Sequence, residues 1–205
     1  MSTTTQPPPR HLKVLHAERL PAQGGFLLMP STLSQHDLPS LVRLLGERPV
    51  TYLVEAGRAL PKGIESFLEA SGSAVATFTP VPEAVAEYQA TLQELAAQGR
   101  TIVLIPAAAA TLNAPVTTLP GATLEFLCAA GLPVLPLHVH HAAEVRLSIE
   151  PGASDEEAVF AFAPLLSAEE TTPAAILEHF FLLAAETFSA NPALDMSLPY
   201  ALIQG

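Results

Sequence analysis

Three histidines close together form the densest group of side chains in this sequence that could bind a metal ion or move a proton. They are His138, His140 and His141, and they follow an apolar run. Residues two apart in a strand lie on the same face, so His138 and His140 could offer two imidazole rings to one metal ion. Only Glu144 lies near them as a further ligand, so we expect a structural or solvent-facing pair and no metal site.

A second candidate is the dipeptide His36-Asp37, which contains a base and a carboxylate that could orient it. Neighbouring residues of a helix point about 100° apart, so these two side chains do not face each other. We therefore expect His36 on a helix surface and no local dyad.

Cys128 is the single cysteine, which excludes an intrachain disulfide and a cysteine-based zinc site. It lies in an apolar segment and is interpreted as a small buried hydrophobic residue.

Composition limits the chemistry further. The 205 residues include 20 acidic and 9 basic ones, which gives a net charge of −11, and 49% of the chain is hydrophobic. Such hydrophobicity excludes intrinsic disorder, and the negative charge argues against nucleic-acid binding through a basic face. Charged residues make up 14% of the chain, against about 25% in a typical domain. Motifs for a P-loop, a dinucleotide-binding turn and a nucleophile elbow are absent, so we expect no cofactor.

An alternation of strands and helices must position these side chains. Short apolar runs predict buried strands, and apolar residues at helical spacing between them predict helices. The alternation predicts an α/β fold with a mixed central sheet flanked by helices. Gly24-Gly25 is interpreted as a flexible lead-in to the first strand. The expected strands are 25–30, 50–55, 73–78, 101–106, 132–139, 145–149 and 159–163, and the expected helices are 33–45, 61–70, 82–98, 121–130 and 172–189.

A single domain is expected over residues 20–190. Residues 1–19 are predicted to form a flexible, proline-rich tail, and residues 191–205 a second tail or a short helix. The N-terminal residues lack the apolar core of a signal peptide. Prolines interrupt the uncharged stretch 101–124, which therefore favours a strand and a loop over a membrane-spanning helix. We expect a cytoplasmic protein.

The first strand is followed by Ser31 and Thr32, then by Ser34 and Asp37. This segment resembles N-H-x-S-x-x-D, the first motif of the glycerolipid acyltransferases, the lysophosphatidic acid acyltransferase superfamily. Ser34 and Asp37 match the motif. Ser31 stands at the asparagine position, and Thr32 stands at the position of the family's catalytic histidine. The resemblance implies the single-domain glycerolipid acyltransferase-like fold.

Two further stretches carry the resemblance. ELAAQGRTIVLIPAAAAT matches the family pattern at Gly99 and Pro106, but alanines replace Glu-Gly-Thr-Arg, which in the family helps to hold the acceptor's phosphate. PGATLEFLCAAGLPVLPLHV retains Gly121, whereas Pro120 replaces a basic residue. Strand 73–79 lacks the arginine of the family's second motif. The four alanines are Ala107, Ala108, Ala109 and Ala110.

These departures change what the resemblance implies for the site. Thr32 and Asp37 stand at the catalytic positions, and Ser31, Ser34, Gly121 and the four alanines stand at the substrate-binding positions. A threonine hydroxyl is no base at neutral pH, and loss of a general base typically removes about 10²–10⁴ in rate. Alanines make no charge-assisted contact with a phosphate. The prediction is a catalytically inactive acyltransferase-like domain with a lipid-binding, acyl-binding or regulatory role.

Two other hypotheses stay open. One is an active acyltransferase acting on a lysophospholipid, or a thioester hydrolase, with His36, His138, His140 or His141 as the base. The other is a ligand-free α/β interaction module.

Residues 179–205 resemble the segment after the acyltransferase domain in bacterial 2-acylglycerophosphoethanolamine acyltransferases fused to acyl-carrier-protein synthetases. The resemblance implies an acyl chain, a lysophospholipid, acyl-CoA, acyl carrier protein or a synthetase as partners, and peripheral contact with the inner membrane.

Overall fold

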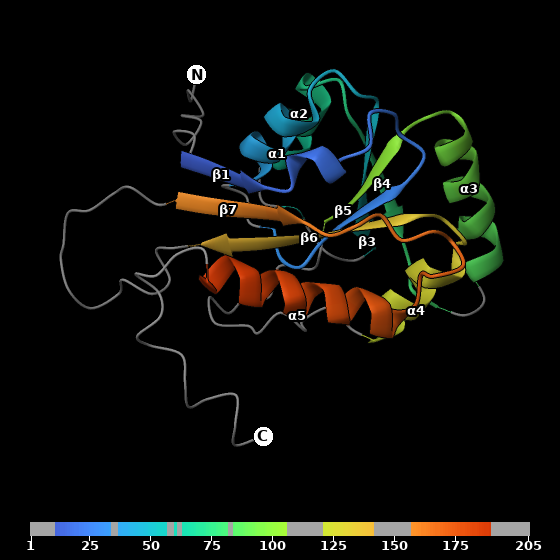
Figure 1. The fold of residues 1–205 in the computed structure, drawn as a ribbon. Coiled ribbons are helices and arrows are strands. Elements are labelled where there is room, and N and C mark those ends of the chain that lie inside the picture. Colours follow the sequence, from blue (N-terminus) through green and yellow to red (C-terminus); the bar gives the residue numbers. More distant parts are fainter. Residues whose placement is uncertain are drawn as a thin grey trace.

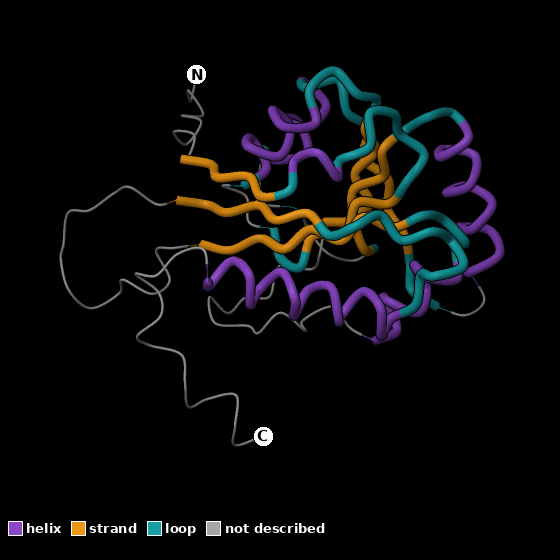
Figure 2. The backbone as a smooth tube through the Cα atoms, in the orientation of Figure 1, coloured by secondary structure: helices purple, strands orange, loops and turns teal. Residues whose placement is uncertain are grey.

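The computed structural model describes residues 11–33, 37–56, 60, 63–81, 84–105, 121–141 and 157–189. In these ranges seven strands form one sheet, and helices cover both of its faces (Figures 1 and 2). The expected α/β fold with a mixed central sheet is thereby confirmed. The strands are β1 (His11–Leu15), β2 (Leu27–Pro30), β3 (Val50–Glu55), β4 (Ala74–Phe78), β5 (Thr101–Ile105), β6 (Val134–His141) and β7 (Glu157–Phe162), and the helices are η1 (Ala17–Arg19, a 3-10 helix), α1 (Leu38–Leu45), α2 (Ile64–Ala70), α3 (Val85–Ala97), α4 (Gly121–Ala129) and α5 (Pro173–Ser189).

The strand order across the sheet is β1-β7-β6-β2-β5-β3-β4. All neighbouring strands are parallel except β6 and β7, which are antiparallel. The apolar runs that predicted strands occupy the middle of the sheet, where Leu27, Leu28, Tyr52 and Ile102 are fully buried. A parallel strand covered on both faces needs such a continuous apolar run, because its side chains point alternately to two buried layers.

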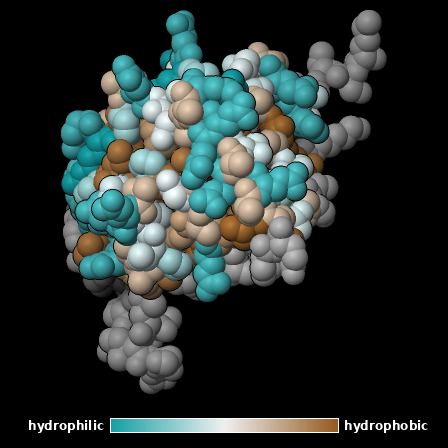
Figure 3. Space-filling model, turned by 90° about the vertical axis from the view of Figure 1, so that its right-hand side faces the viewer, coloured by the Kyte–Doolittle hydropathy of each residue, from teal (hydrophilic) through white to brown (hydrophobic). Residues whose placement is uncertain are grey.

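Helices α1 and α2 cover one face of the sheet, and α3, α4 and α5 cover the other (Figure 1). Helix α3 turns an apolar stripe toward the core, in which Leu92 is buried and Val85, Tyr88 and Leu95 are partly buried against the same cluster. Figure 3 shows the side of the molecule that lies on the right of Figure 1, where hydrophilic side chains alternate with small apolar areas. The helices thus turn their apolar stripes inward and their polar faces outward.

Strands β2 and β5 are paired at their amino ends, and their described pairing does not continue to their carboxyl ends. In the described sheet only Leu27 with Ile102 and Leu28 with Val103 are partners. Beyond these pairs, β2 continues beside β6 and β5 continues beside β3. The chain leaves β2 toward β3 on one side and leaves β5 toward β6 on the other. In open α/β sheets such a reversal marks the crevice where ligands bind, outside the carboxyl ends of the strands. We call this place the fork.

The opposite ends of the same two strands are packed against each other. The N–H of Gly25 donates to the carbonyl of Arg100 at 2.9 Å. A Cβ atom on Gly24 would lie 2.0 Å from the carbonyl oxygen of Gly99, and Gly25 has a φ of +95°. The prediction of a flexible lead-in at Gly24-Gly25 is therefore wrong. Glycine is required there because two backbones approach too closely for a side chain.

The N-terminal part of the described chain corrects a second prediction. From His11 onward the expected tail over residues 1–19 is part of the fold, because β1 pairs in parallel with β7 and η1 follows it. Composition suggested a tail because prolines precede this strand, whereas its pairing partner lies far away in the sequence. The other terminal prediction, for residues 191–205, lies outside the described residues, as does the expected strand 145–149.

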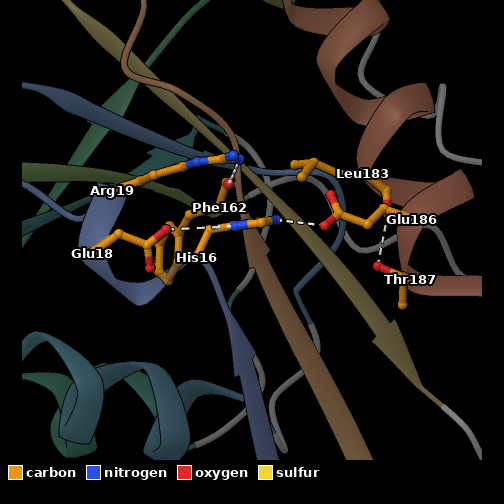
Figure 4. A network of polar contacts seen from close by, with 7 residues as sticks. All are labelled: His16, Glu18, Arg19, Phe162, Leu183, Glu186 and Thr187. Carbon is orange, nitrogen blue, oxygen red and sulfur yellow. Dashed lines mark hydrogen bonds and ion pairs between the residues drawn. The ribbon is translucent and has the colours of Figure 1, made fainter. Parts of the chain in front are cut away.

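Polar contacts fasten this first segment to the last helix (Figure 4). His16 has a left-handed φ of 58°, and its Nε2 lies 2.7 Å from an Oε1 of Glu186 in α5. Its Nδ1 lies 3.6 Å from Glu18. Arg19 donates to the carbonyl of Phe162 at the end of β7 at 2.8 Å. Residues near the two ends of the described chain are thus held together at the edge of the sheet.

Candidate functional site at the fork

Two of the candidate site residues, Ser31 and Thr32, lie at the carboxyl end of β2. Ser31 follows the last residue of that strand and is only 3% exposed, whereas Thr32 is exposed. The backbone therefore passes from the core to the surface between these two residues. Their position coincides with the fork, where the described pairing of β2 with β5 has ended and its pairing with β6 continues.

Ser31 fastens the end of β2 to β6 through three polar contacts. Its N–H donates to the carbonyl of Leu137 at 2.7 Å, and the N–H of Val139 donates to its Oγ at 3.2 Å. The same Oγ lies 3.3 Å from Nδ1 of His138, which is 4% exposed. An N–H can only donate, so the Oγ accepts from Val139. The hydroxyl proton is then left for Nδ1 when the imidazole carries its own proton on Nε2.

Sequence reasoning singled out both members of this pair but not their contact. Ser31 was considered for its place in a motif and His138 for its place in a histidine cluster. What joins them is the parallel register of β2 and β6, in which Pro30 is opposite Leu137. That register depends on the strand order of the whole sheet, so local sequence carries no signal for it.

The two histidines expected to share a face of β6 do so. The rings of His138 and His140 are stacked, with centroids 6.4 Å apart and planes inclined by 25°. His138 is buried in the sheet rather than facing solvent. Within the described residues no group of three His, Cys, Asp or Glu side chains could hold a metal ion. His141 is the last residue of β6, and Glu144 lies outside the described residues.

Asp37, the motif carboxylate, is the N-cap residue of α1 and is 1% exposed. Its main-chain carbonyl accepts the N–H of Leu41 at 2.9 Å, and its carboxylate makes no capping hydrogen bond to that helix. Ser34 and His36 lie outside the described residues. The structure therefore gives positions for three of the motif residues, Ser31, Thr32 and Asp37.

The residues at the family's phosphate-binding positions lie mostly outside the described residues, including Pro106, Pro120 and the four alanines. Gly121 begins α4 and is exposed. Two arginines lie at the amino edge of the sheet, away from the fork. Arg100 donates to Thr51 Oγ1 at 2.7 Å and to a main-chain carbonyl at 2.8 Å, and Arg48 donates to the carbonyl of Pro21. Both guanidinium groups are hydrogen-bonded to oxygens of the protein itself, namely two main-chain carbonyls and one threonine hydroxyl.

The single cysteine is not a nucleophile at neutral pH. Cys128 is half-buried in α4, and burial, with the nearby carboxylate of Glu125, raises the pKa of its thiol to about 11. The thiolate, which is the reactive form, is therefore scarce. Cys128 packs against the core on the α4 side of the sheet, as a small apolar residue would.

The fold is similar to that of the 1-acyl-sn-glycerophosphate (LPA) acyltransferase PlsC from Thermotoga maritima. The TM-score is 0.56, and the match covers 90% of this chain and 73% of that one at 14% sequence identity. The chain has an acyltransferase-like fold. At that identity the likeness concerns the fold alone. No protein-family model matches the chain, and no curated protein matches it significantly in sequence.

The described helices add one finding about membranes. None of them combines the length and the apolar character that a bilayer-crossing helix requires.

Proposed function

We propose that this chain binds an acyl chain or a lysophospholipid at the fork and does not carry out the direct acyl transfer of the acyltransferases it resembles. The observation that carries the proposal is the position of Thr32. This residue stands where the resemblance implies a catalytic histidine, is exposed, and lies at the carboxyl end of β2, where the described pairing with β5 has ended. The shared fold supports an acyl-type ligand, and the residue type argues against base catalysis at this position.

The electrostatics of the chain support an uncharged part of the lipid as the main contact. The net charge is −11, and the two arginines at the amino edge of the sheet are bonded to backbone or threonine oxygens. An acyl chain needs an apolar surface and no cations, so it fits this chemistry better than a phosphate does. On this proposal, a synthetase or an acyl carrier protein would be a partner that delivers or receives the acyl group.

Ligand titration and a transfer assay test the proposal together. Purified protein is titrated by calorimetry with a long-chain fatty acid and with a lysophospholipid below its micelle concentration. It is then incubated with acyl-CoA, or acyl carrier protein loaded with an acyl group, and a lysophospholipid. We expect saturable binding of the fatty acid and no diacyl product.

A substitution at the fork provides the matched comparison. Thr32→Trp adds a bulky side chain at the exposed end of β2 and should weaken acyl binding at least about tenfold, whereas Thr32→Ser should leave it unchanged. Absence of saturable binding in the unmodified protein would favour a ligand-free interaction module. Formation of diacyl product that Thr32→Val abolishes would show instead that the chain is an active acyltransferase.

A further inference from the structure

The geometry points to Ser31 as a nucleophile that accepts an acyl group from a thioester, with His138 as its general base. The reaction differs from the direct transfer to a lysophospholipid discussed above, since the protein itself is the acyl acceptor. It rests on the proposed function for the nature of the acyl group. The inference stands on the contact between these two side chains and on its place in the sheet.

The donor and acceptor roles around Ser31 Oγ are compatible with an activated hydroxyl. The N–H of Val139 donates to Ser31 Oγ at 3.2 Å, and the remaining polar neighbour of the Oγ is Nδ1 of His138 at 3.3 Å. In the tautomer that carries its proton on Nε2, Nδ1 of His138 is an acceptor, and the hydroxyl of Ser31 donates to it. A serine paired in this way with a histidine is the arrangement in which a weak nucleophile is activated, and such hydrogen bonds are often long before substrate binds.

The location of the pair fits a reaction site better than a random core contact does. Ser31 directly follows β2 at the fork and is buried, and the next residue, Thr32, is exposed, so the chain reaches the surface immediately after the proposed nucleophile. The sheet also holds the pair firmly. The N–H of Ser31 donates to the carbonyl of Leu137 at 2.7 Å, and His138 lies within β6. A nucleophile and its base on adjacent strands keep their relative geometry, because the backbone of both is fixed.

The chemical step balances without a cofactor. The Oγ of Ser31 attacks the thioester carbonyl carbon, and its proton moves to Nδ1 of His138. The carbon–sulfur bond breaks as the carbon–oxygen bond of a serine ester is completed. The departing thiolate takes the proton from Nδ1, so the products are acylated Ser31 and a free thiol. Water can then release the carboxylic acid and restore the hydroxyl.

An alkyl fluorophosphonate tests the inference on the whole chain, because it forms a stable bond with an activated serine. After labelling at pH 8, intact mass and peptide mapping should show one adduct, on Ser31. His138→Gln should slow labelling at least about 100-fold. His16→Gln, at the β1 edge of the sheet, should label as the unmodified protein does, which separates the loss of the base from a general effect of replacing a histidine. Circular dichroism verifies that each variant is folded.

Peptide mapping of the unmodified protein decides the matter even if a variant fails to fold. No adduct, or an adduct on Thr32 or another residue, overturns the inference. With palmitoyl-CoA, release of free thiol that is lost in Ser31→Ala supports it, and no release above the rate in buffer contradicts it. Fatty-acid binding without labelling would support the proposed function and contradict this inference. Labelling of Ser31 without fatty-acid binding would support an activated serine and contradict the proposed function.

Discussion

The two ends of the β2–β5 pair differ in what holds them. At the amino end the backbones are in such close contact that Gly24 has no room for a Cβ, and Gly25 is hydrogen-bonded to Arg100. At the carboxyl end the described pairing of β2 with β5 has ended, and the backbone and side chain of Ser31 join β2 to β6. A close backbone contact leaves no room for a side chain, whereas a side-chain contact can change while the strand pairing is kept. The amino end therefore serves folding, and the carboxyl end is the place where the proposed ligand would bind.

The largest effect is expected at the amino end. Gly24→Ala would place a methyl group 2.0 Å from the carbonyl oxygen of Gly99, and neither backbone can yield without disturbing the strand pairing. We expect a loss of about 3 kcal/mol or more in the free energy of unfolding, measured by urea denaturation.

Gly121→Ala is the control for that substitution. Apart from its chain neighbours and its own helix backbone, no described residue has an atom within 4 Å of the Cβ that Gly121 would gain, and its φ is not positive. The change should be neutral or stabilising by about 0.5 kcal/mol. If the two alanine variants unfold at the same urea concentration, the amino end is not the closely packed region described above.

An intermediate effect is expected at the carboxyl end. Ser31→Ala removes the acceptor of the Val139 N–H and the partner of His138 Nδ1, both of them inside the sheet. Leaving such groups unsatisfied costs about 1–3 kcal/mol, which urea denaturation would detect. Thr32→Ala, one residue further along and exposed, should change stability by less than about 0.5 kcal/mol. Equal losses in the two variants would mean that Ser31 is not a fastening point.

The smallest effect is expected at a contact that belongs to neither end. The side chains of His16 and Glu186 are 23% and 47% exposed, so their 2.7 Å contact is screened by water. His16→Ala should cost less than about 1 kcal/mol, and 1 M sodium chloride should reduce the difference. His16→Gly should cost less than His16→Ala, because glycine adopts the left-handed φ of 58° without strain. If His16→Ala lowers the free energy of unfolding as much as Ser31→Ala does, the more exposed contact is not the weaker one, and this prediction is wrong.

The sequence was sufficient for the elements that depend on local pattern. Apolar runs such as Val50–Glu55 and Thr101–Ile105 are strands because both faces of each are covered, and α3 lies within the range where apolar residues recur at helical spacing. The α/β fold followed from the alternation. The strand His11–Leu15 was missed, because His11 and Lys13 leave it no continuous apolar run and its partner β7 lies far away in the sequence.

The individual residues of the candidate site could be predicted from the sequence, but the contacts between them could not. The motif comparison located Ser31, Thr32 and Asp37 along the sequence, and the histidine spacing placed His138 and His140 on one face. The contact between Ser31 and His138 requires β6 to lie next to β2, although three strands intervene between them in the sequence. Long-range order of this kind is set by the packing of whole layers, which no short motif encodes.

The pairing of β1 with β7 has a consequence for how the chain folds during its synthesis. The first described strand finds its only described sheet neighbour in the last described strand, and the contact from His16 to Glu186 joins it to the last described helix. Such long-range pairing is slow, because the closure entropy of the long intervening segment opposes the contact before it forms. The segment His11–Arg19 is therefore expected to dock after the other described strands, although it is synthesised before them.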